Sequence, residues 1–220
     1  MGPLIVWRIS DGRRGHDSQS LGLVRALGRL TPCQIFDLPA LPWPQALAAW
    51  LGGKLPGTDR LPDPHLIVGA GHGAHGSMLA ARRARGGRTV VLMRPTLPAC
   101  CFDFCIIPEH DAAPANGRIL HSCGPLNTVS LATQPDLTRG LILIGGPSRH
   151  FLWRFDELLP HIKTLLATGG LRWSLADSPR TPPADSEKLA ALTGAEFIPC
   201  HDTDSAWLEN QLRAAGTVWV

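Results

Sequence analysis

The chain has 220 residues, of which 44% are hydrophobic and 18% are charged, and its formal net charge is +3 at pH 7. This length allows one large or two small α/β domains with a full hydrophobic core. The small net charge, and the lack of any Lys/Arg run with interleaved aromatic residues, exclude a typical nucleic-acid-binding protein. The sequence shows no signal peptide and no run of eighteen apolar residues, so we expect a cytoplasmic protein, or one that contacts the inner face of a membrane only from its surface.

Strands and helices alternate along the chain. Strands are predicted at residues 4–9, 33–37, 65–68, 89–93, 102–107, 119–120, 141–144, 171–175, 196–198 and 217–220. Helices are predicted at residues 19–30, capped by Asp17 or Ser18, and at 45–51, 77–85, 156–167, 185–192 and 204–215. This alternation is typical of parallel sheets covered on both faces. The pattern weakens between residues 126 and 138 and then restarts, so we expect an α/β protein with two tandem Rossmann-like units, residues 1–130 and 139–220.

Ligands of open parallel sheets bind at the carboxyl ends of the strands. The loops that follow four of the predicted strands are rich in glycine and in polar side chains. We therefore expect candidate site residues there: Gly12, Arg13, Gly15, His16 and Gln19; Gly69, Gly71 and His72; Glu109, His110 and Asp111; and Gly145, Gly146, Pro147, Ser148 and Arg149. No metal site is expected, because the six cysteines contain no C-x-x-C pair and the histidines lack zinc spacing.

Two of the glycine loops have the pattern of a phosphate site. Gly145-Gly146 ends a strand of four apolar residues and precedes a helix, so backbone N–H groups would face an anion there. A plain tight strand–helix connection explains the same residues. Gly69-x-Gly71-x-x-Ala74 matches the relaxed dinucleotide fingerprint, and Arg94 on the next strand would suit NADP, although the usual ribose-binding acid is missing.

A proline-framed segment at residues 39–64 contains one apolar piece, residues 45–51, preceded by Leu41 and Trp43. Two interpretations stay open. The segment packs as core or as a lid, or its Trp and Leu side chains face a membrane or an acceptor.

Five motifs occur in a characteristic order. They are Ser10-Asp11-Gly12-Arg13-x-Gly15-His16-x-x-Gln19, Val68-Gly69-Ala70-Gly71, Phe102-Asp103 through Ile107-Pro108-Glu109-His110-Asp111, Leu143-Ile144-Gly145-Gly146-Pro147-Ser148, and Ser178-Pro179-Arg180-Thr181-Pro182. Over essentially the whole chain, this series resembles the family named for the plant mitochondrial fission factor ELM1.

The resemblance implies a GT-B-like architecture of two Rossmann-like domains, similar to nucleotide-sugar-dependent glycosyltransferases, in which the second domain holds the nucleotide. It also implies a UDP-sugar donor, no required metal or other cofactor, and a lipid-linked or cell-envelope glycan acceptor. Family members continue past the last strand, so the second unit is expected to be incomplete. Two other functions remain: a non-catalytic adaptor that keeps the fold, and the NADP-binding oxidoreductase. The sequence does not support a nucleoside-diphosphate-sugar epimerase, because it lacks a Tyr-x-x-x-Lys pair and has no tyrosine at all.

If the chain is a glycosyltransferase, an inverting transfer needs a base near neutral pH, and His16 is the first candidate, with His110-Asp111 as the alternative. Asp11 then orients His16 or Arg13, or it closes an Asx turn. The donor phosphates are expected at Gly145 to Arg149 and at Arg180 and Thr181, with Arg180 as a bidentate partner. His16 bracing its own loop, and Arg180 lying free in solvent, are the simpler explanations.

Overall fold

The computed structural model describes residues 2–114, 117–130, 134–148 and 152–220 and divides the chain into two compact units, residues 1–128 and 129–220. The first unit contains β1 (Leu4–Ser10), α1 (Arg14–Leu30), β2 (Cys33–Pro39), α2 (Trp43–Gly52), β3 (Leu66–Ala70), α3 (His75–Arg85), β4 (Arg88–Leu92), β5 (Phe104–Pro108) and β6 (Ile119–Ser122). The second contains β7 (Asp136–Leu143), α4 (Phe155–Ala167), β8 (Arg172–Ala176), α5 (Pro183–Ala190), β9 (Ala195–Ile198), α6 (Ser205–Ala214) and β10 (Ala215–Trp219). None of the described helices is long and apolar enough to cross a membrane.

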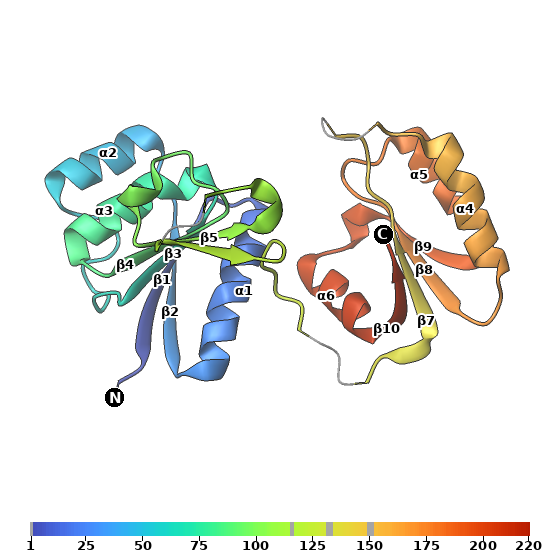
Figure 1. Ribbon diagram of the computed structural model, residues 1–220, viewed down its shortest axis with the longest axis horizontal. Coiled ribbons are helices and arrows are strands. Elements are labelled where there is room, and N and C mark those ends of the chain that lie inside the picture. The colour runs from blue at the N-terminus through green and yellow to red at the C-terminus, as the bar shows by residue number, and fades with distance from the viewer. Residues whose placement is uncertain (1, 115–116, 131–133, 149–151) are drawn as a thin grey trace. The chain divides into compact units, whose positions relative to one another are not determined.

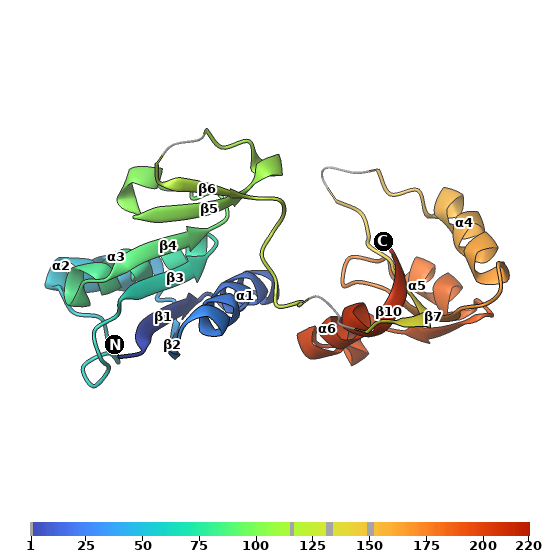
Figure 2. The same ribbon diagram turned by 60° about the horizontal axis from the view of Figure 1, so that its bottom comes forward.

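The first unit is built on a parallel sheet with the strand order β2-β1-β3-β4-β5-β6 (Figures 1 and 2). Helix α1 covers one face and helices α2 and α3 cover the other (Figure 2). Successive side chains of β1 point to opposite faces of the sheet, as is usual for a strand. Trp7 packs in the cluster under α2 and α3, whereas Val6 packs under α1. All strand ends that carry the candidate loops therefore lie at one edge.

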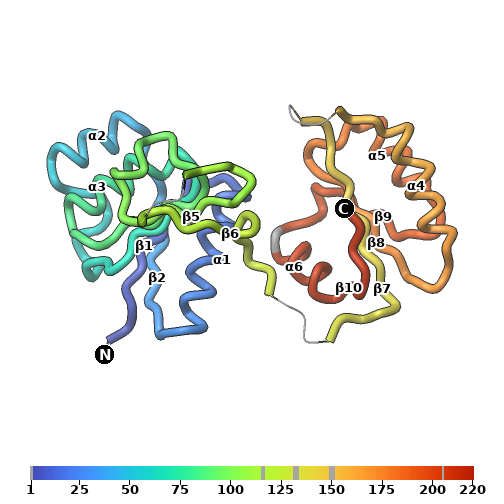
Figure 3. The backbone as a smooth tube through the Cα atoms, viewed as in Figure 1, coloured from blue at the N-terminus to red at the C-terminus, as the bar shows by residue number. Residues whose placement is uncertain are grey.

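The second unit has a four-stranded parallel sheet with the order β10-β7-β8-β9 (Figure 3). Ile162 of α4 and Leu189 of α5 pack with Ile142 and Leu175 in one buried cluster. The Phe and Leu side chains of α4 join this cluster, so the helix packs on the sheet through an apolar face. The fold class, an α/β protein of Rossmann-like units, is as predicted.

Two predicted elements begin five residues too late, while the other predicted boundaries differ from the observed ones by at most two residues. Strand β7 begins five residues earlier than the apolar run, because its polar start is held by neighbours: Asp136 pairs with Arg172 at 2.9 Å, and Arg139 donates to Gln211 at 2.9 Å. Helix α1 begins at Arg14 rather than at Gln19, with Asp17 inside its first turn instead of at the cap. Gly15 and His16 are therefore helical residues and not part of the loop, whereas Gln19 lies in the helix as predicted.

His75, at the start of α3, gives the first unit a built-in pH dependence. Its ring is buried against Phe102, and its Nε2 has no hydrogen-bond partner among the described residues. Burial, and then the neighbouring His72, lower the pKa of His75 from 6.5 to about 4. The unfolded chain therefore binds this proton first, so native stability is complete above pH 6.5 and falls as the pH drops towards 4, by up to about 3 kcal/mol. In His75→Leu, urea unfolding between pH 4 and 6.5 should show a flatter pH dependence, whereas exposed His201→Leu should keep the wild-type slope.

Candidate functional site

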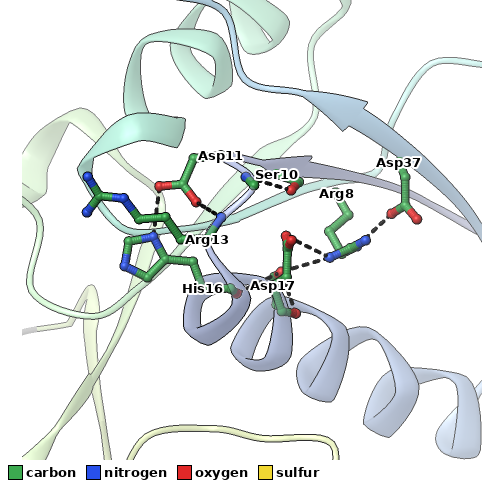
Figure 4. Close-up of polar contacts among 9 residues, drawn as sticks. Arg8, Ser10, Asp11, Arg13, His16, Asp17 and Asp37 are labelled. Atoms are coloured by element: carbon green, nitrogen blue, oxygen red, sulfur yellow. Dashed lines mark hydrogen bonds and ion pairs between the residues drawn. The ribbon is translucent and has the colours of Figure 1, made fainter. Parts of the chain in front are cut away.

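The turn after β1 brings His16 against Asp11 (Figure 4). Gly12 makes the turn with a φ of +76°, and an Asp11 carboxylate oxygen accepts the backbone N–H of Arg13 at 3.2 Å. The other carboxylate oxygen of Asp11 lies 2.8 Å from Nδ1 of His16. Asp11 thus closes an Asx turn and also orients His16, so the two predicted roles are combined in one side chain.

This contact defines the chemistry of the ring. The side chains of Asp11 and His16 are 8% and 16% exposed, so the pair is largely shielded from water. A carboxylate accepts the Nδ1 proton, which leaves Nε2 as the basic nitrogen. Nε2 points away from Asp11 (Figure 4), and no hydrogen bond joins it to any described residue. The arrangement can take up a proton from a bound hydroxyl group.

Two glycines of the loop after β3 make room for this pair. A Cβ on Gly71, whose φ is +73°, would lie 2.8 Å from Nε2 of His16 and closer still to its Cε1. A Cβ on Gly73 would lie 2.9 Å from the Cβ of Asp11. The space that a Cβ on Gly69 would need is likewise occupied, by the side chain of Met78 of α3. These glycines are explained by packing within the unit, and the space a dinucleotide phosphate would need beside Gly71 holds an imidazole.

The position of the pair within the sheet is that of a ligand site. In the order β2-β1-β3, the chain reverses its direction of growth between β1 and β3, and the carboxyl ends of these two strands border the crevice where ligands bind in such sheets. Asp11 follows β1 and Gly71 follows β3. The sequence therefore assembles His16, Asp11 and Gly71 at this switch point.

A buried arginine beside the site was missed in the sequence. Arg8, on the α1 face of β1, donates to Asp37 of β2 at 2.6 Å, to Asp17 at 3.4 Å and to Ser20 at 3.2 Å (Figure 4). The hydrogen bond with Asp37 raises the pKa of Arg8 despite burial. This network ties the start of α1 to the first two strands. An arginine in the middle of an apolar strand was the available signal.

The other candidates of the first unit are scattered along the same edge. Arg13 is exposed and Gln19 is half-buried in α1, while His72 is exposed. Glu109, His110 and Asp111 follow β5, three strand positions from β1, or about 14 Å. His110 and Asp111 are 3.7 Å apart, with side chains 62% and 34% exposed, so they are less shielded than the first pair.

In the second unit, Gly145 and Gly146 rest on the turn that follows β8. The Thr181 hydroxyl donates to the carbonyl of Gly145 at 2.6 Å and accepts the N–H of Ser178 at 3.0 Å. A Cβ on Gly146 would lie 2.7 Å from the nitrogen of Thr181 and closer to the carbonyl of Arg180. The motifs at 145–148 and 178–182, far apart in sequence, therefore form one structure at the carboxyl edge.

The predicted helix after this turn is confirmed, because α4 starts at Phe155, one residue before the predicted start. Its first residue is ten positions after Gly145, so the helix does not follow the glycine pair directly. Arg149 lies outside the described residues, Pro147 is exposed, and Ser148 is half-buried. The Arg180 guanidinium is exposed and forms no ion pair or hydrogen bond with the described part of the chain. At the carboxyl edge of the second sheet, the Arg180 side chain could therefore pair with an anionic ligand.

The second unit also contains a pocket away from the glycine turn. A pocket of about 570 Å³ lies between α4 and α5, lined by residues that include Leu166, Lys163 and Gly194. The ends of these helices place it at the amino edge of the sheet, away from Gly145.

Among the described residues, no group of three or more His, Cys, Asp or Glu side chains is placed to hold a metal ion.

Comparison with known proteins assigns the class and then the family. Solved structures of the GT-B type, built from Rossmann-like units, share this fold. The sequence model "Mitochondrial fission ELM1" matches residues 14–220. The chain belongs to this family. No curated protein matches it by sequence.

Two solved structures illustrate the likeness. A putative UDP-N-acetylglucosamine 2-epimerase from Listeria monocytogenes has a TM-score of 0.58 at 11% identity, over 99% of this chain and 74% of that one. A complex of S. aureus MnaA with UDP has a TM-score of 0.51 at 12% identity, with the same coverage of 99% and 74%. At these identities the likeness concerns the fold.

Proposed function

We propose that the chain is a glycosyltransferase that uses a nucleotide sugar, with UDP as the nucleotide. The observation that carries the proposal is the shielded His16–Asp11 pair at the switch point of the first sheet. In a protein that only recruits a partner, the contact would brace the loop and leave Nε2 of His16 unused. The UDP bound to a protein of the same fold supports the choice of nucleotide.

In this proposal, His16 removes the proton from the acceptor hydroxyl. The hydroxyl oxygen attacks the anomeric carbon of the sugar, the bond from that carbon to the diphosphate oxygen breaks, and UDP leaves with the bonding electrons. The proton stays on Nε2 of His16, where Asp11 stabilises the imidazolium. The contact between Asp11 and Nδ1 of His16 is kept throughout this step.

The second unit would hold the donor. Gly145 and Gly146 present backbone at the carboxyl edge without side chains, and the Thr181 hydroxyl fixes the carbonyl of Gly145. Backbone N–H groups and the Arg180 guanidinium would then neutralise the diphosphate, with no metal or other cofactor required. As the acceptor we propose a lipid-linked or cell-envelope glycan, reached by a cytoplasmic protein at the inner face of the membrane.

A second candidate is epimerisation of a UDP-sugar. The Listeria monocytogenes protein of this fold is a putative UDP-N-acetylglucosamine 2-epimerase, so the fold brings back a function that the sequence did not support. This alternative needs only the donor, whereas transfer needs an acceptor as well. Interconversion of UDP-N-acetylglucosamine in the absence of any acceptor, followed by NMR, separates the two.

The donor half of the proposal predicts that UDP stabilises the fold and that Arg180→Ala weakens this effect. A ligand at one hundred times its dissociation constant raises the free energy of unfolding by about 2.7 kcal/mol. A thermal-shift series with UDP, UDP-sugars, GDP- and ADP-sugars, NADP and ATP measures it. We expect a response to UDP compounds that drops about tenfold in affinity in Arg180→Ala and is unchanged in His16→Gln. Exposed Arg213→Ala, in the same unit, is the matched control.

Each other result selects another function. A response to NADP alone would support the oxidoreductase, and silence towards every nucleotide would support the adaptor. A UDP response reduced equally by Arg180→Ala and Arg213→Ala would contradict the donor site at Gly145.

A further inference from the structure

Helix α2 buries its small side chains and exposes its large ones. Ala46 and Ala49 are buried, whereas Trp43, Leu47, Trp50 and Leu51 are 52%, 51%, 40% and 65% exposed. Residues separated by four, seven and eight positions lie on one side of a helix. The four large apolar side chains therefore form a continuous outward stripe, which we call the α2 face.

The packing beneath the helix explains this reversal. Helix α2 lies over α3 on the outside of the first unit (Figures 1 and 2). A Cβ on Gly76 of α3 would lie 2.9 Å from the Cβ of Ala46. Because the two helices approach this closely, only small side chains fit between them, and the large ones must point outward.

Two basic residues lie next to the α2 face. Helix α2 has no charged residue, Lys54 follows it, and the nearest acidic residues in the sequence are Asp37 and Asp59. The Arg83 guanidinium lies over the Trp50 ring, 5.0 Å from its centroid. Exposed Trp and Leu of α2, with Arg83 of α3 and Lys54 beside them, suit contact with the interface of an anionic bilayer.

We propose that the α2 face docks on a membrane surface that carries anionic lipids. The four side chains enter the headgroup region, while Arg83 and Lys54 contact lipid phosphates. A stable protein partner would have to cover more than these four side chains, because their exposed parts amount to about 400 Å² of the roughly 800 Å² per partner that a standard protein interface buries.

The α2 face also adjoins the edge that carries the site. Gly71 packs on His16, and five residues later Gly76 approaches the ring of Trp43. Trp43 begins α2 directly beyond the carboxyl end of β2. A membrane at this face would bring lipid headgroups to the side of the unit where His16 lies. Membrane docking does not depend on nucleotide binding, so its test and the UDP series fail separately.

Vesicle flotation tests the proposal. We expect the chain to bind vesicles of phosphatidylcholine with about 30% phosphatidylglycerol, and to bind pure phosphatidylcholine at least threefold more weakly. Leu47→Gln/Leu51→Gln should reduce the partition coefficient at least tenfold, and Arg83→Gln severalfold in the anionic vesicles only. Leu30→Gln/Leu152→Gln removes two almost fully exposed leucines elsewhere and should bind as the unaltered chain does. Circular dichroism melting verifies that every variant is folded.

Three results would overturn the proposal. The first is no binding of the unaltered chain to either vesicle. The second is an equal loss in the two double leucine variants. The third is a concentration-dependent dimer that Leu47→Gln/Leu51→Gln abolishes, which would assign the α2 face to a second copy of the chain.

Discussion

Gly146→Ala should destabilise the second unit by about 3 kcal/mol and abolish its response to UDP. The added Cβ would overlap the backbone of Arg180 and Thr181, and backbone atoms cannot rotate away as the end of a side chain can. The turn at 178–181 must then separate from the end of β7. The Thr181 hydroxyl would lose the carbonyl of Gly145, and Arg180 would leave the edge where the diphosphate is proposed to lie.

The adjacent glycine provides the control. A Cβ on Gly145 would meet no atom within 4 Å, and its φ is not in the left-handed region. Gly145→Ala should therefore change the free energy of unfolding by less than about 1 kcal/mol. Urea unfolding gives the stability, and hydrogen exchange of β7 and β8 locates the change. If both alanine variants are equally stable, the contact between the two motifs is not structural.

The fold could be predicted because it depends on local patterns. Alternating apolar strands and amphipathic helices specify parallel layers wherever they occur, and the short apolar strands from β1 to β8 show this pattern plainly. Boundaries were predicted poorly where polar residues start an element. The start of α1 depends on Asp17 meeting Arg8, and the start of β7 depends on Asp136 meeting Arg172. Such pairs are fixed by the folded chain and leave no periodic signal.

The candidate site, like the fold, could be predicted only in part. Glycines, His16 and Asp11 were recognisable as candidates because they follow strands. That Gly71 and Gly73 accommodate His16 and Asp11, rather than a phosphate, depends on the approach of two segments that are far apart in the sequence. The exposure of α2 could not be decided from the sequence for a related reason, because Gly76 determines which face of the helix is buried.

Gly71→Ala should affect both stability and chemistry. Its φ of +73° disfavours a Cβ, and the Cβ would also occupy the position of the His16 ring. We expect a loss of about 2–3 kcal/mol in the free energy of unfolding, measured in urea. Gly12→Ala is the matched control, because its φ is +76° but a Cβ there meets nothing within 4 Å. It should lose only about 1 kcal/mol, the cost of the backbone conformation alone.

The difference between these two variants isolates the contact with His16. If the ring causes the extra loss, His16→Gly should relieve it, so that the double variant His16→Gly/Gly71→Ala is about 1–3 kcal/mol more stable than the sum of the single changes predicts. The displaced ring also loses its contact with Asp11. The rate at which UDP is formed from a UDP-sugar should therefore fall in Gly71→Ala as far as in His16→Gln, by about 10²–10⁴-fold. A variant that is destabilised yet keeps its rate would show that His16 braces the loop and is not the base. Equal stability of Gly71→Ala and Gly12→Ala would show that the ring and the glycine do not share this space in solution.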